Sequence, residues 1–192
     1  DLIDIIHYVR HNTKFKLINT IIWRYKNGMS AHRYFANRHE EVIWLTKTND
    51  YYFDLDAVRE PYSEKDLEAA LKDKRLNPEN TLKGKNPTNV WEINRLNGNS
   101  KERVGHPTQK PVEIIDRFIK ALSYPGSIVL DFFAGSGTVG RVCIKEGRHC
   151  LMCDSDQSSI EFFNKHLELM RKMGQSTNYK HIDNTEDFFT LL

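Results

Sequence analysis

The sequence predicts an α/β protein with a mostly parallel sheet, and the second half of the chain carries the pattern that predicts it. Residues 127–131 and 149–154 are short apolar segments typical of strands, and residues 139–145 and 160–173 have helical spacing. Gly147 is expected to end the first of these helices. A glycine-rich turn separates the first of these strands from the first helix. Strands and helices that alternate in this order form parallel sheets with right-handed crossovers.

The beginning of the chain predicts a helix followed by strands. Apolar residues within 2–10 have helical spacing. Residues 17–23 and 41–45 are short, apolar and rich in β-branched side chains, so we expect two buried strands. Residues 51–53 are predicted to form a short third strand.

The middle of the chain differs in its residue pattern. Turn-forming residues are frequent across 59–105, so we expect an irregular insertion that packs on a larger body, with a polar helix over 64–74. Order returns at 112–122, which has the pattern of an amphipathic helix, with Pro111 at the first helical position.

Composition limits the class of protein. Hydrophobic residues make up 39% of the 192 residues and charged residues 28%, which is typical of soluble globular proteins. No apolar run reaches the roughly 18 residues of a membrane helix, and we expect a cytoplasmic protein without membrane contact. The three cysteines favour a reducing compartment. The first residue is Asp1 and not Met, so we expect the chain to begin within a longer protein.

Positive charge is concentrated in the middle of the chain. Residues 72–110 hold nine Lys and Arg but only four Asp and Glu, whereas the segments on either side are net negative. Such a cluster is typical of a surface that faces phosphates. A solvated basic loop explains the charge equally well.

The segment with the clearest chemical meaning is 131–138, DFFAGSGT, between a strand that we expect to be buried and a predicted helix. Ligands of open α/β sheets bind at the carboxyl ends of strands. Small residues allow close approach of the backbone, and a helix N-terminus favours an anionic group such as the carboxylate of a methionine moiety. Asp131 suits an ammonium group, and Asp154, at the end of the next strand, suits a ribose diol.

Two other interpretations of this turn stay open. Gly135 to Gly140 also matches the G-x-G-x-x-G pattern of dinucleotide-binding proteins, with Asp154 following Gly135 by 19 residues. That match alone is weak, and the carboxylate of Asp131 beside the phosphates of a dinucleotide is unfavourable. The third interpretation is a purely structural glycine turn.

A second segment, residues 106–111 (HPTQKP), precedes the predicted amphipathic helix. Taken alone it is a stiff, polar helix entry. Together with 131–138, about twenty residues later, it resembles motif X followed by motif I of the β-group DNA amino-methyltransferases, which make N6-methyladenine or N4-methylcytosine. Residues 27–35 and 38–41 resemble the neighbourhood of motif VIII in the same group, and 53–61 resembles the stretch after it.

Two further segments narrow the resemblance. Residues 72–78 and 95–100 are similar to those of the adenine-methylating members that act on GAATTC sites. The resemblance covers essentially residues 1–154. It implies a Rossmann-like, S-adenosyl-L-methionine-dependent methyltransferase fold that is incomplete at the N-terminus. It also implies methyl transfer to N6 of adenine in double-stranded DNA, within a type II restriction–modification system of the bacterial cytoplasm; the preference for adenine rests on the resemblance alone.

The resemblance also divides the chain by role. Residues 1–58 correspond to the later part of the half that holds the target adenine, 59–105 to the target-recognition insertion, and 106–192 to the S-adenosyl-L-methionine-binding half. The implied cofactor contacts are Thr108, Gln109, Lys110, Asp131, Phe132, Phe133, Ala134, Gly135, Ser136 and Asp154. The candidate contacts with DNA phosphates are Lys74, Arg75, Lys83, Lys85, Arg95 and Arg103.

The catalytic signature of the group, an Asp/Asn/Ser-Pro-Pro-aromatic tetrapeptide, is absent, because no two of the six prolines are adjacent. No catalytic residue is therefore assigned. We expect the tetrapeptide on a missing N-terminal segment or on a second chain, and a homodimer is a further candidate assembly. The alternatives are the cofactor-binding half of a split or inactive methyltransferase, N4-cytosine specificity, and a free DNA-binding module.

Other constellations have simpler explanations. Residues 39–41 (HEE) lack the second His of a zinc-protease helix, and no metal site is predicted. Cys150 and Cys153 lie on a predicted strand whose faces alternate, so we interpret them as structural thiols. Trp23, Trp44 and Trp91 are expected in the core. For Phe35 and His39, packing in the core and a place beside a flipped base are equally good interpretations.

Overall fold

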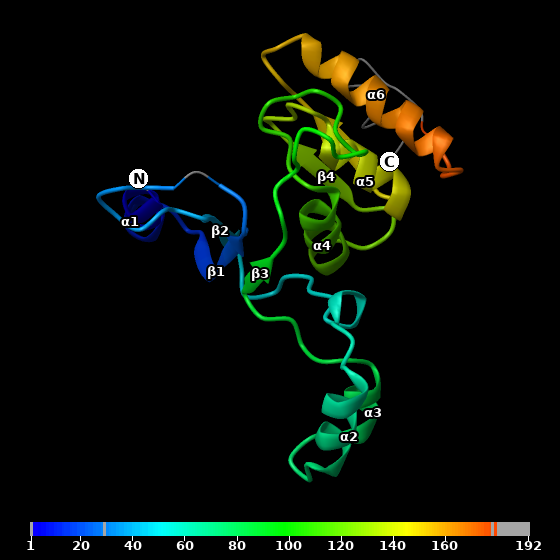
Figure 1. The fold of residues 1–192 in the computed structure, drawn as a ribbon. Coiled ribbons are helices and arrows are strands. Elements are labelled where there is room, and N and C mark those ends of the chain that lie inside the picture. The colour runs from blue at the N-terminus through cyan, green and yellow to red at the C-terminus, as the bar shows by residue number, and fades with distance from the viewer. Residues whose placement is uncertain (1, 29, 178, 180–192) are drawn as a thin grey trace. The chain divides into compact units, whose positions relative to one another are not determined.

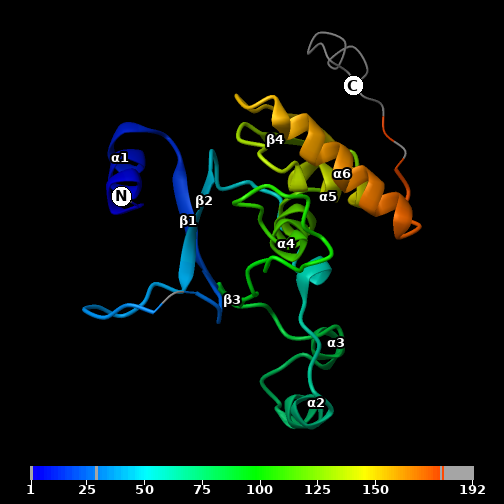
Figure 2. The ribbon, with the colours of Figure 1, turned by 45° about the horizontal axis from the view of Figure 1, so that its top comes forward.

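The structure, a computed structural model, describes residues 2–28, 30–177 and 179 (Figure 1). The chain forms two compact units. The first unit combines the residues up to Lys101 with Lys110–Tyr124, and the second combines Glu102–Gln109 with the residues from Pro125 onward (Figure 2). The boundaries of these two units differ from the predicted boundaries between the three roles, because residues 110–124 belong to the first unit. The three roles stay predictions.

The first unit contains a three-stranded sheet in the order β2-β1-β3. β1 (Lys16–Arg24) pairs antiparallel with β2 (His39–Thr46) and parallel with β3 (Val90–Glu92). α1 (Leu2–Asn12) precedes β1. The predicted helix at 2–10 and the predicted strands at 17–23 and 41–45 are confirmed, although this sheet is mixed and not parallel throughout.

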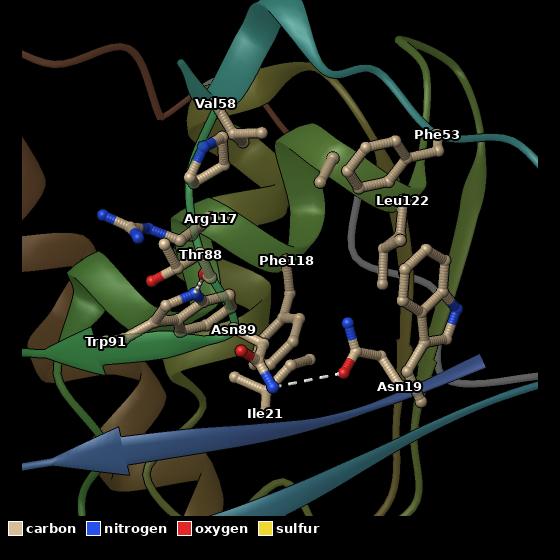
Figure 3. A pocket seen from close by; sticks show the side chains of 13 residues that line it. Asn19, Ile21, Phe53, Val58, Thr88, Asn89, Trp91, Arg117, Phe118 and Leu122 are labelled. Atoms are coloured by element: carbon tan, nitrogen blue, oxygen red, sulfur yellow. Dashed lines mark hydrogen bonds between the residues drawn. The ribbon is translucent and has the colours of Figure 1, made fainter. Parts of the chain in front are cut away.

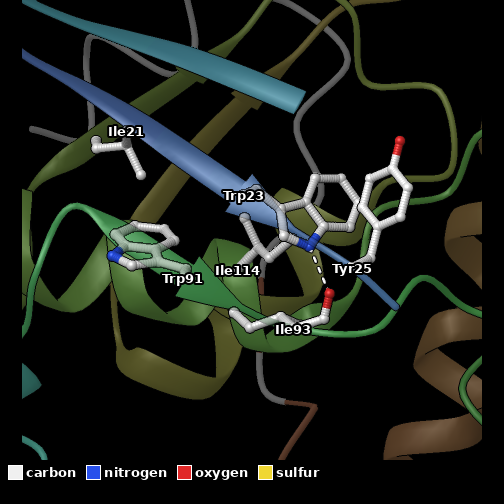
Figure 4. Packing of buried hydrophobic residues seen from close by; sticks show 6 residues of the cluster. All are labelled: Ile21, Trp23, Tyr25, Trp91, Ile93 and Ile114. Atoms are coloured by element: carbon white, nitrogen blue, oxygen red, sulfur yellow. Dashed lines mark hydrogen bonds between the residues drawn. The ribbon is translucent and has the colours of Figure 1, made fainter. Parts of the chain in front are cut away.

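The core of this unit follows from the alternation of β1. Ile21 and Trp23 face the same side and are 5% and 3% exposed. They form a cluster with Tyr25, Trp91, Ile93 and Ile114 (Figure 4). Trp23 Nε1 donates a hydrogen bond of 2.7 Å to the carbonyl of Ile93, so the buried indole is satisfied. The predicted core positions of Trp23 and Trp91 are confirmed, and Trp44 is partly buried against the cluster.

Helix α4 (Val112–Leu122) has the predicted bounds and packs with the first unit. Its buried residues include Ile114, Ile119 and Ala121, which fits the predicted apolar face. Pro111 is the N-cap and not the first helical residue. The predicted strand at 51–53 is wrong: these residues form no strand, and Phe53 stacks on Trp44 with ring centroids 5.4 Å apart. The short helix η1 (Asp56–Val58) follows.

The segment 59–105 is more regular than predicted. The polar helix predicted over 64–74 is confirmed as α2 (Glu64–Lys72), which is capped by Ser63. The segment also contains α3 (Pro78–Leu82), capped by Asn77, which was not predicted. It also supplies β3, whose Trp91 enters the core of the first unit. The turn-forming residues of this segment predicted an irregular structure. The three residues of β3 nevertheless pair with β1 and extend the sheet.

The second unit is built around two parallel strands, β4 (Ile128–Asp131) and β5 (His149–Met152). α5 (Thr138–Glu146) connects them, and α6 (Ser158–Lys172) packs on α5. All four elements were predicted, with β5 ending two residues earlier. α5 ends at Gly147, whose φ of 69° gives the left-handed C-cap expected of glycine.

Strand β4 differs from its prediction in one respect. It was predicted to be buried, but Ile128 and Leu130 are 44% and 49% exposed. The two residues share one face of the strand, and nothing among the described residues covers that face fully. In the described part of the chain, no helix is both long and apolar enough to cross a membrane.

Candidate functional site

The candidate site is the glycine loop, residues 131–138, between β4 and α5. Gly135 and Gly137 have φ values of 49° and 75°, which only glycine adopts without strain. A Cβ on Gly137 would lie 2.9 Å from the side chain of Phe163, so close packing also requires glycine there. The loop closes on itself through a hydrogen bond of 2.8 Å from Gly137 N–H to the carbonyl of Ala134. The sequence therefore folds into a tight turn at the carboxyl end of β4.

A third glycine fixes the helix behind the loop. A Cβ on Gly140 would lie 2.6 Å from Met152 of β5 and 2.9 Å from Phe163 of α6. α5 therefore packs closely on both elements, and its first turn is held at the end of the sheet. The loop is also bonded to the residue that follows β5, because Ala134 N–H donates to the carbonyl of Cys153 at 3.0 Å.

Two carboxylates flank the loop. Asp154 accepts hydrogen bonds from Asp156 N–H at 2.9 Å and from Gly135 N–H at 2.7 Å, and these bonds lower its pKa. Burial raises the pKa of Asp131, and the nearby Asp154 adds to the rise. A site with two neighbouring carboxylates favours a cationic ligand, because that ligand relieves their repulsion. Asp131 ends β4 as predicted, and Asp154 follows the last residue of the adjacent strand β5 by two residues.

The segment that precedes α4 contacts this loop. A Cβ on Gly135 would lie 3.2 Å from Cε1 of His106, so the imidazole rests directly on the loop backbone. His106 also makes an edge contact with Phe162 of α6, with ring centroids 5.3 Å apart. Thr108 N–H donates to Nδ1 of His106 at 3.3 Å, and its side chain is exposed beside it. The structure therefore brings together the two segments on which the sequence argument depends.

The neighbours of Thr108 are placed differently. Gln109 is 8% exposed, and its amide accepts from Val104 N–H at 2.9 Å and donates to the carbonyl of Glu102 at 2.8 Å. Its side chain therefore holds the 102–109 turn. Lys110 belongs to the first unit, where its Nζ lies 3.2 Å from the carboxylate of Glu40. The structure does not bring Lys110 and the glycine loop into one unit.

Two aromatic side chains project from the loop. Phe132 is 61% exposed and Phe133 is 91% exposed. Phe133 N–H donates to the carboxylate of Asp131 at 3.1 Å, so a hydrogen bond holds the backbone here although the ring is exposed. Exposed rings beside two carboxylates offer an apolar surface to the planar part of a ligand.

Sequence reasoning missed a buried polar group under the loop. Thr138, Arg141 and His166 are 4%, 5% and 0% exposed, and the imidazole of His166 shares a side-chain hydrogen bond with each of the other two. Burial and the adjacent Arg141 lower the pKa of His166 to about 4. The helical spacing of α6 gave no sign that His166 points inward, because its neighbours in sequence are both polar and apolar.

The six predicted phosphate contacts do not share one environment. Lys83 Nζ lies 2.6 Å from Asp56, and Arg75 pairs with Asp73 at 2.7 Å. Arg95 lies over the ring of Tyr25, with its Cζ 5.1 Å from the centroid. Lys74 and Lys85 are exposed, and Arg103 is half-buried and belongs to the second unit. Acidic partners therefore offset part of the positive charge that the sequence count suggested.

A missed basic residue explains part of this arrangement. The side chain of Arg59 is 8% exposed and donates to Asp56, to the carbonyl of Gly84 and to Asn86 at 2.6, 2.9 and 2.7 Å. It thereby holds the turn at 84–86 against η1. A lone arginine in a charged segment carried no sequence signal for this role.

The first unit contains a pocket of about 100 Å³ between β1, β2 and α4 (Figure 3). Its walls include the rings of Trp44, Phe53, Trp91 and Phe118. The amide of Asn19 reaches it from the bulge of β1 and accepts from Asn89 at 3.4 Å. The sequence predicted Trp44 and Trp91 as core, and the structure shows that they border a cavity too.

The remaining predictions concern the motif VIII neighbourhood and the cysteines. Phe35 is 98% exposed, which excludes its interpretation as a core residue, and Met29 lies outside the described residues. Cys153 is exposed and Cys143 is buried. The hydrogen bond with Cys143, with burial, raises the pKa of Cys150, which keeps this thiol protonated and supports a structural role.

Similarity to known sequences covers most of the chain. The profile of the family N6_N4_Mtase, described as DNA methylase, matches residues 2–165. The Type II methyltransferase M.ScaI of Streptomyces caespitosus is 37% identical over 142 residues, 70% of this chain and 44% of M.ScaI. The DNA adenine methyltransferase YhdJ of Escherichia coli K12 is 34% identical over 158 residues, 81% of this chain and 53% of YhdJ. The chain spans about half the length of these curated relatives.

Solved structures share the fold. The crystal structure of the M1.HpyAVI–SAM complex matches with a TM-score of 0.59 and 24% identity over 86% of this chain and 69% of that chain. The cytosine-N4-specific PvuII DNA methyltransferase matches with a TM-score of 0.64 and 15% identity, over 98% of this chain and 60% of its own. At these identities the likeness shows the fold, and it confirms the predicted Rossmann-like α/β class.

Proposed function

The chain belongs to the DNA methylase family N6_N4_Mtase, and from that premise we propose that it binds S-adenosyl-L-methionine as part of a DNA methyltransferase. The observation that carries the proposal is the contact of His106 with Gly135, which joins the two predicted cofactor segments around Asp131 and Asp154. This site offers what the cofactor requires: carboxylates for its cationic methionine part, a start of α5 whose N-cap Gly137 provides no side-chain cap, and exposed rings at Phe132 and Phe133.

The proposed reaction is transfer of the cofactor's methyl group to N6 of adenine in double-stranded DNA, in a type II restriction–modification system. Relatives at 34–37% identity are named Type II methyltransferases or DNA adenine methyltransferase, which supports adenine over cytosine. The target base would leave the duplex to reach the site. The exposed lysines of the predicted recognition segment, Lys74 and Lys85, would contact the phosphates.

The residues of this chain would bind and orient the cofactor, which supplies the activated methyl group. Asp131 would pair with the ammonium of the methionine part, and Asp154 would accept from the ribose hydroxyls while it keeps its bond to Gly135 N–H. No Pro-Pro pair occurs in this sequence, so the group that accepts the hydrogen bonds of the target amine would come from another segment or chain. The target sequence that the resemblance implies is GAATTC.

A methyl-transfer assay tests this function. The purified protein is incubated with tritiated S-adenosyl-L-methionine and a duplex that contains GAATTC, with and without a polypeptide carrying the Asp-Pro-Pro-Tyr-type segment of a relative. We expect label in N6-methyladenine only when that segment is present. Label in N4-methylcytosine would support the cytosine alternative, and cross-linking of NAD in place of S-adenosyl-L-methionine would support the dinucleotide interpretation.

A further inference from the structure

A chain of four buried polar side chains runs beneath the glycine loop. Ser136, Thr138, Arg141 and His166 are 5%, 4%, 5% and 0% exposed. The Oγ of Ser136 lies 2.9 Å from Oγ1 of Thr138, which lies 3.4 Å from Nε2 of His166. Nδ1 of the same imidazole lies 3.4 Å from NH1 of Arg141. Polar groups buried this deeply are placed by their hydrogen bonds, so the direction of each bond matters.

The guanidinium of Arg141 fixes that direction. A guanidinium donates hydrogen bonds and never accepts them. Nδ1 of His166 must therefore be the bare, accepting nitrogen, and the proton of the neutral imidazole sits on Nε2. The lowered pKa of His166, about 4, agrees with a neutral ring at pH 7. Nε2–H then donates to Oγ1 of Thr138.

The two hydroxyls continue the chain. The bond between Oγ1 of Thr138 and Oγ of Ser136 can run in either direction. Because Oγ1 of Thr138 accepts from His166, cooperative polarisation of the hydroxyl favours Thr138 as its donor. In this direction Ser136 Oγ accepts from Thr138, and the hydroxyl hydrogen of Ser136 has no acceptor within the described part of the protein. Ser136 belongs to the glycine loop. Its hydroxyl hydrogen is therefore the end of this series of hydrogen bonds that a ligand of the loop could accept.

We propose that Arg141 and His166 are positioning residues that orient this chain so that Ser136 donates its hydroxyl hydrogen to the carboxylate of S-adenosyl-L-methionine. The inference rests on the proposed function and adds a residue pair that does not touch the cofactor. A reversed chain would present a lone pair of Ser136 to the carboxylate and repel it. A hydroxyl that donates to a carboxylate makes a charge-assisted bond, which is stronger than a neutral one.

The tautomer of His166 tests the direction without any ligand. In protein labelled with 15N-histidine, proton–nitrogen correlation spectra at pH 7 distinguish the two neutral tautomers and the imidazolium. We expect the proton on Nε2 of His166. A proton on Nδ1, or a doubly protonated ring, would overturn the inference, because Arg141 could then no longer donate to that nitrogen.

Isosteric variants test the effect on the ligand. Thr138→Val removes the hydroxyl at nearly constant volume, and Thr138→Ser keeps it as the matched control. We expect Thr138→Val to raise the Kd for S-adenosyl-L-methionine about tenfold, with Thr138→Ser close to the unaltered protein. Ser136→Ala should weaken binding at least as much. The double variant should bind like Ser136→Ala alone, because the two groups act in series.

A ligand without the carboxylate separates this role from a structural one. Decarboxylated S-adenosylmethionine should bind the unaltered protein and Thr138→Val equally well. Equal weakening of both ligands by Thr138→Val, or additive losses in the double variant, would overturn the inference. No binding of S-adenosyl-L-methionine to the unaltered protein would instead refute the proposed function, and the tautomer experiment would still report the direction of the chain.

Discussion

The imidazole of His106 rests on the backbone of Gly135, so closely that a Cβ at position 135 would lie 3.2 Å from its Cε1. The same glycine has a φ of 49° and donates its N–H to Asp154 at 2.7 Å. One backbone position thus joins the 106–109 segment, the glycine loop and the end of β5. The account of the site depends on this junction.

Gly135→Ala should disturb the junction directly. The added methyl group would meet His106 and would strain a left-handed backbone, which costs about 1–2 kcal/mol. We expect a lower midpoint of thermal unfolding and weaker binding of S-adenosyl-L-methionine, measured by scanning calorimetry and by titration. Gly98→Ala is the matched control, because a Cβ there meets nothing within 4 Å. Equal behaviour of the two variants would contradict the assigned packing.

Asp131→Asn should separate stability from binding. Burial raises the pKa of Asp131, so the native state disfavours its charged form, and the carboxylate opposes folding once the pH is above its ordinary pKa. We therefore expect the amide variant to unfold at a higher temperature at pH 7 and yet to bind S-adenosyl-L-methionine more than tenfold less tightly. A variant that is less stable and binds equally well would show that Asp131 is a structural residue.

The lowered pKa of His166 predicts that the free energy of unfolding depends on pH. Its pKa is lowered from 6.5 to about 4 in the folded protein, so the unfolded chain binds a proton first as the pH falls. The free energy of unfolding should therefore decrease between pH 6.5 and pH 4, by up to about 3 kcal/mol. Urea unfolding across this range checks it, and His166→Gln should remove most of the slope. Parallel pH profiles for the two proteins would contradict a buried neutral imidazole.

The salt dependence of DNA binding tests the recognition segment. Lys74 and Lys85 are exposed, whereas Lys83 lies 2.6 Å from Asp56. We expect Lys74→Ala and Lys85→Ala each to reduce the slope of log K against log salt by about one. Lys14→Ala, outside the segment, serves as the control. An unchanged slope in both variants would place the phosphate contacts elsewhere.

The sequence predicted most of the fold because its patterns are local. The spacing of apolar residues in α4 and the glycine that ends α5 act within a few neighbouring residues, and both predictions are confirmed. β3 escaped prediction because a strand of three residues has no period, and its place in the sheet depends on pairing with β1. The strand predicted at 51–53 failed for a related reason: Phe53 packs on Trp44 without a strand partner.

The candidate site, like the fold, could be predicted from the sequence only in part. The resemblance to motifs X and I predicted that 106–111 and 131–138 lie together, and His106 does rest on Gly135 of the loop. It could not predict that the amide of Gln109 is used to hold its own turn, or that Lys110 pairs with Glu40. The inward direction of His166 and Arg141 follows from three-dimensional packing and has no counterpart in a linear motif.

The most direct test of the central claim is a calorimetric titration of S-adenosyl-L-methionine into the purified protein, with Asp131→Ala beside it. The account predicts one-to-one binding that the substitution weakens by more than tenfold. A protein that is folded by circular dichroism and releases no heat of binding with this cofactor would contradict the claim that residues 106–109 and 131–154 form its site.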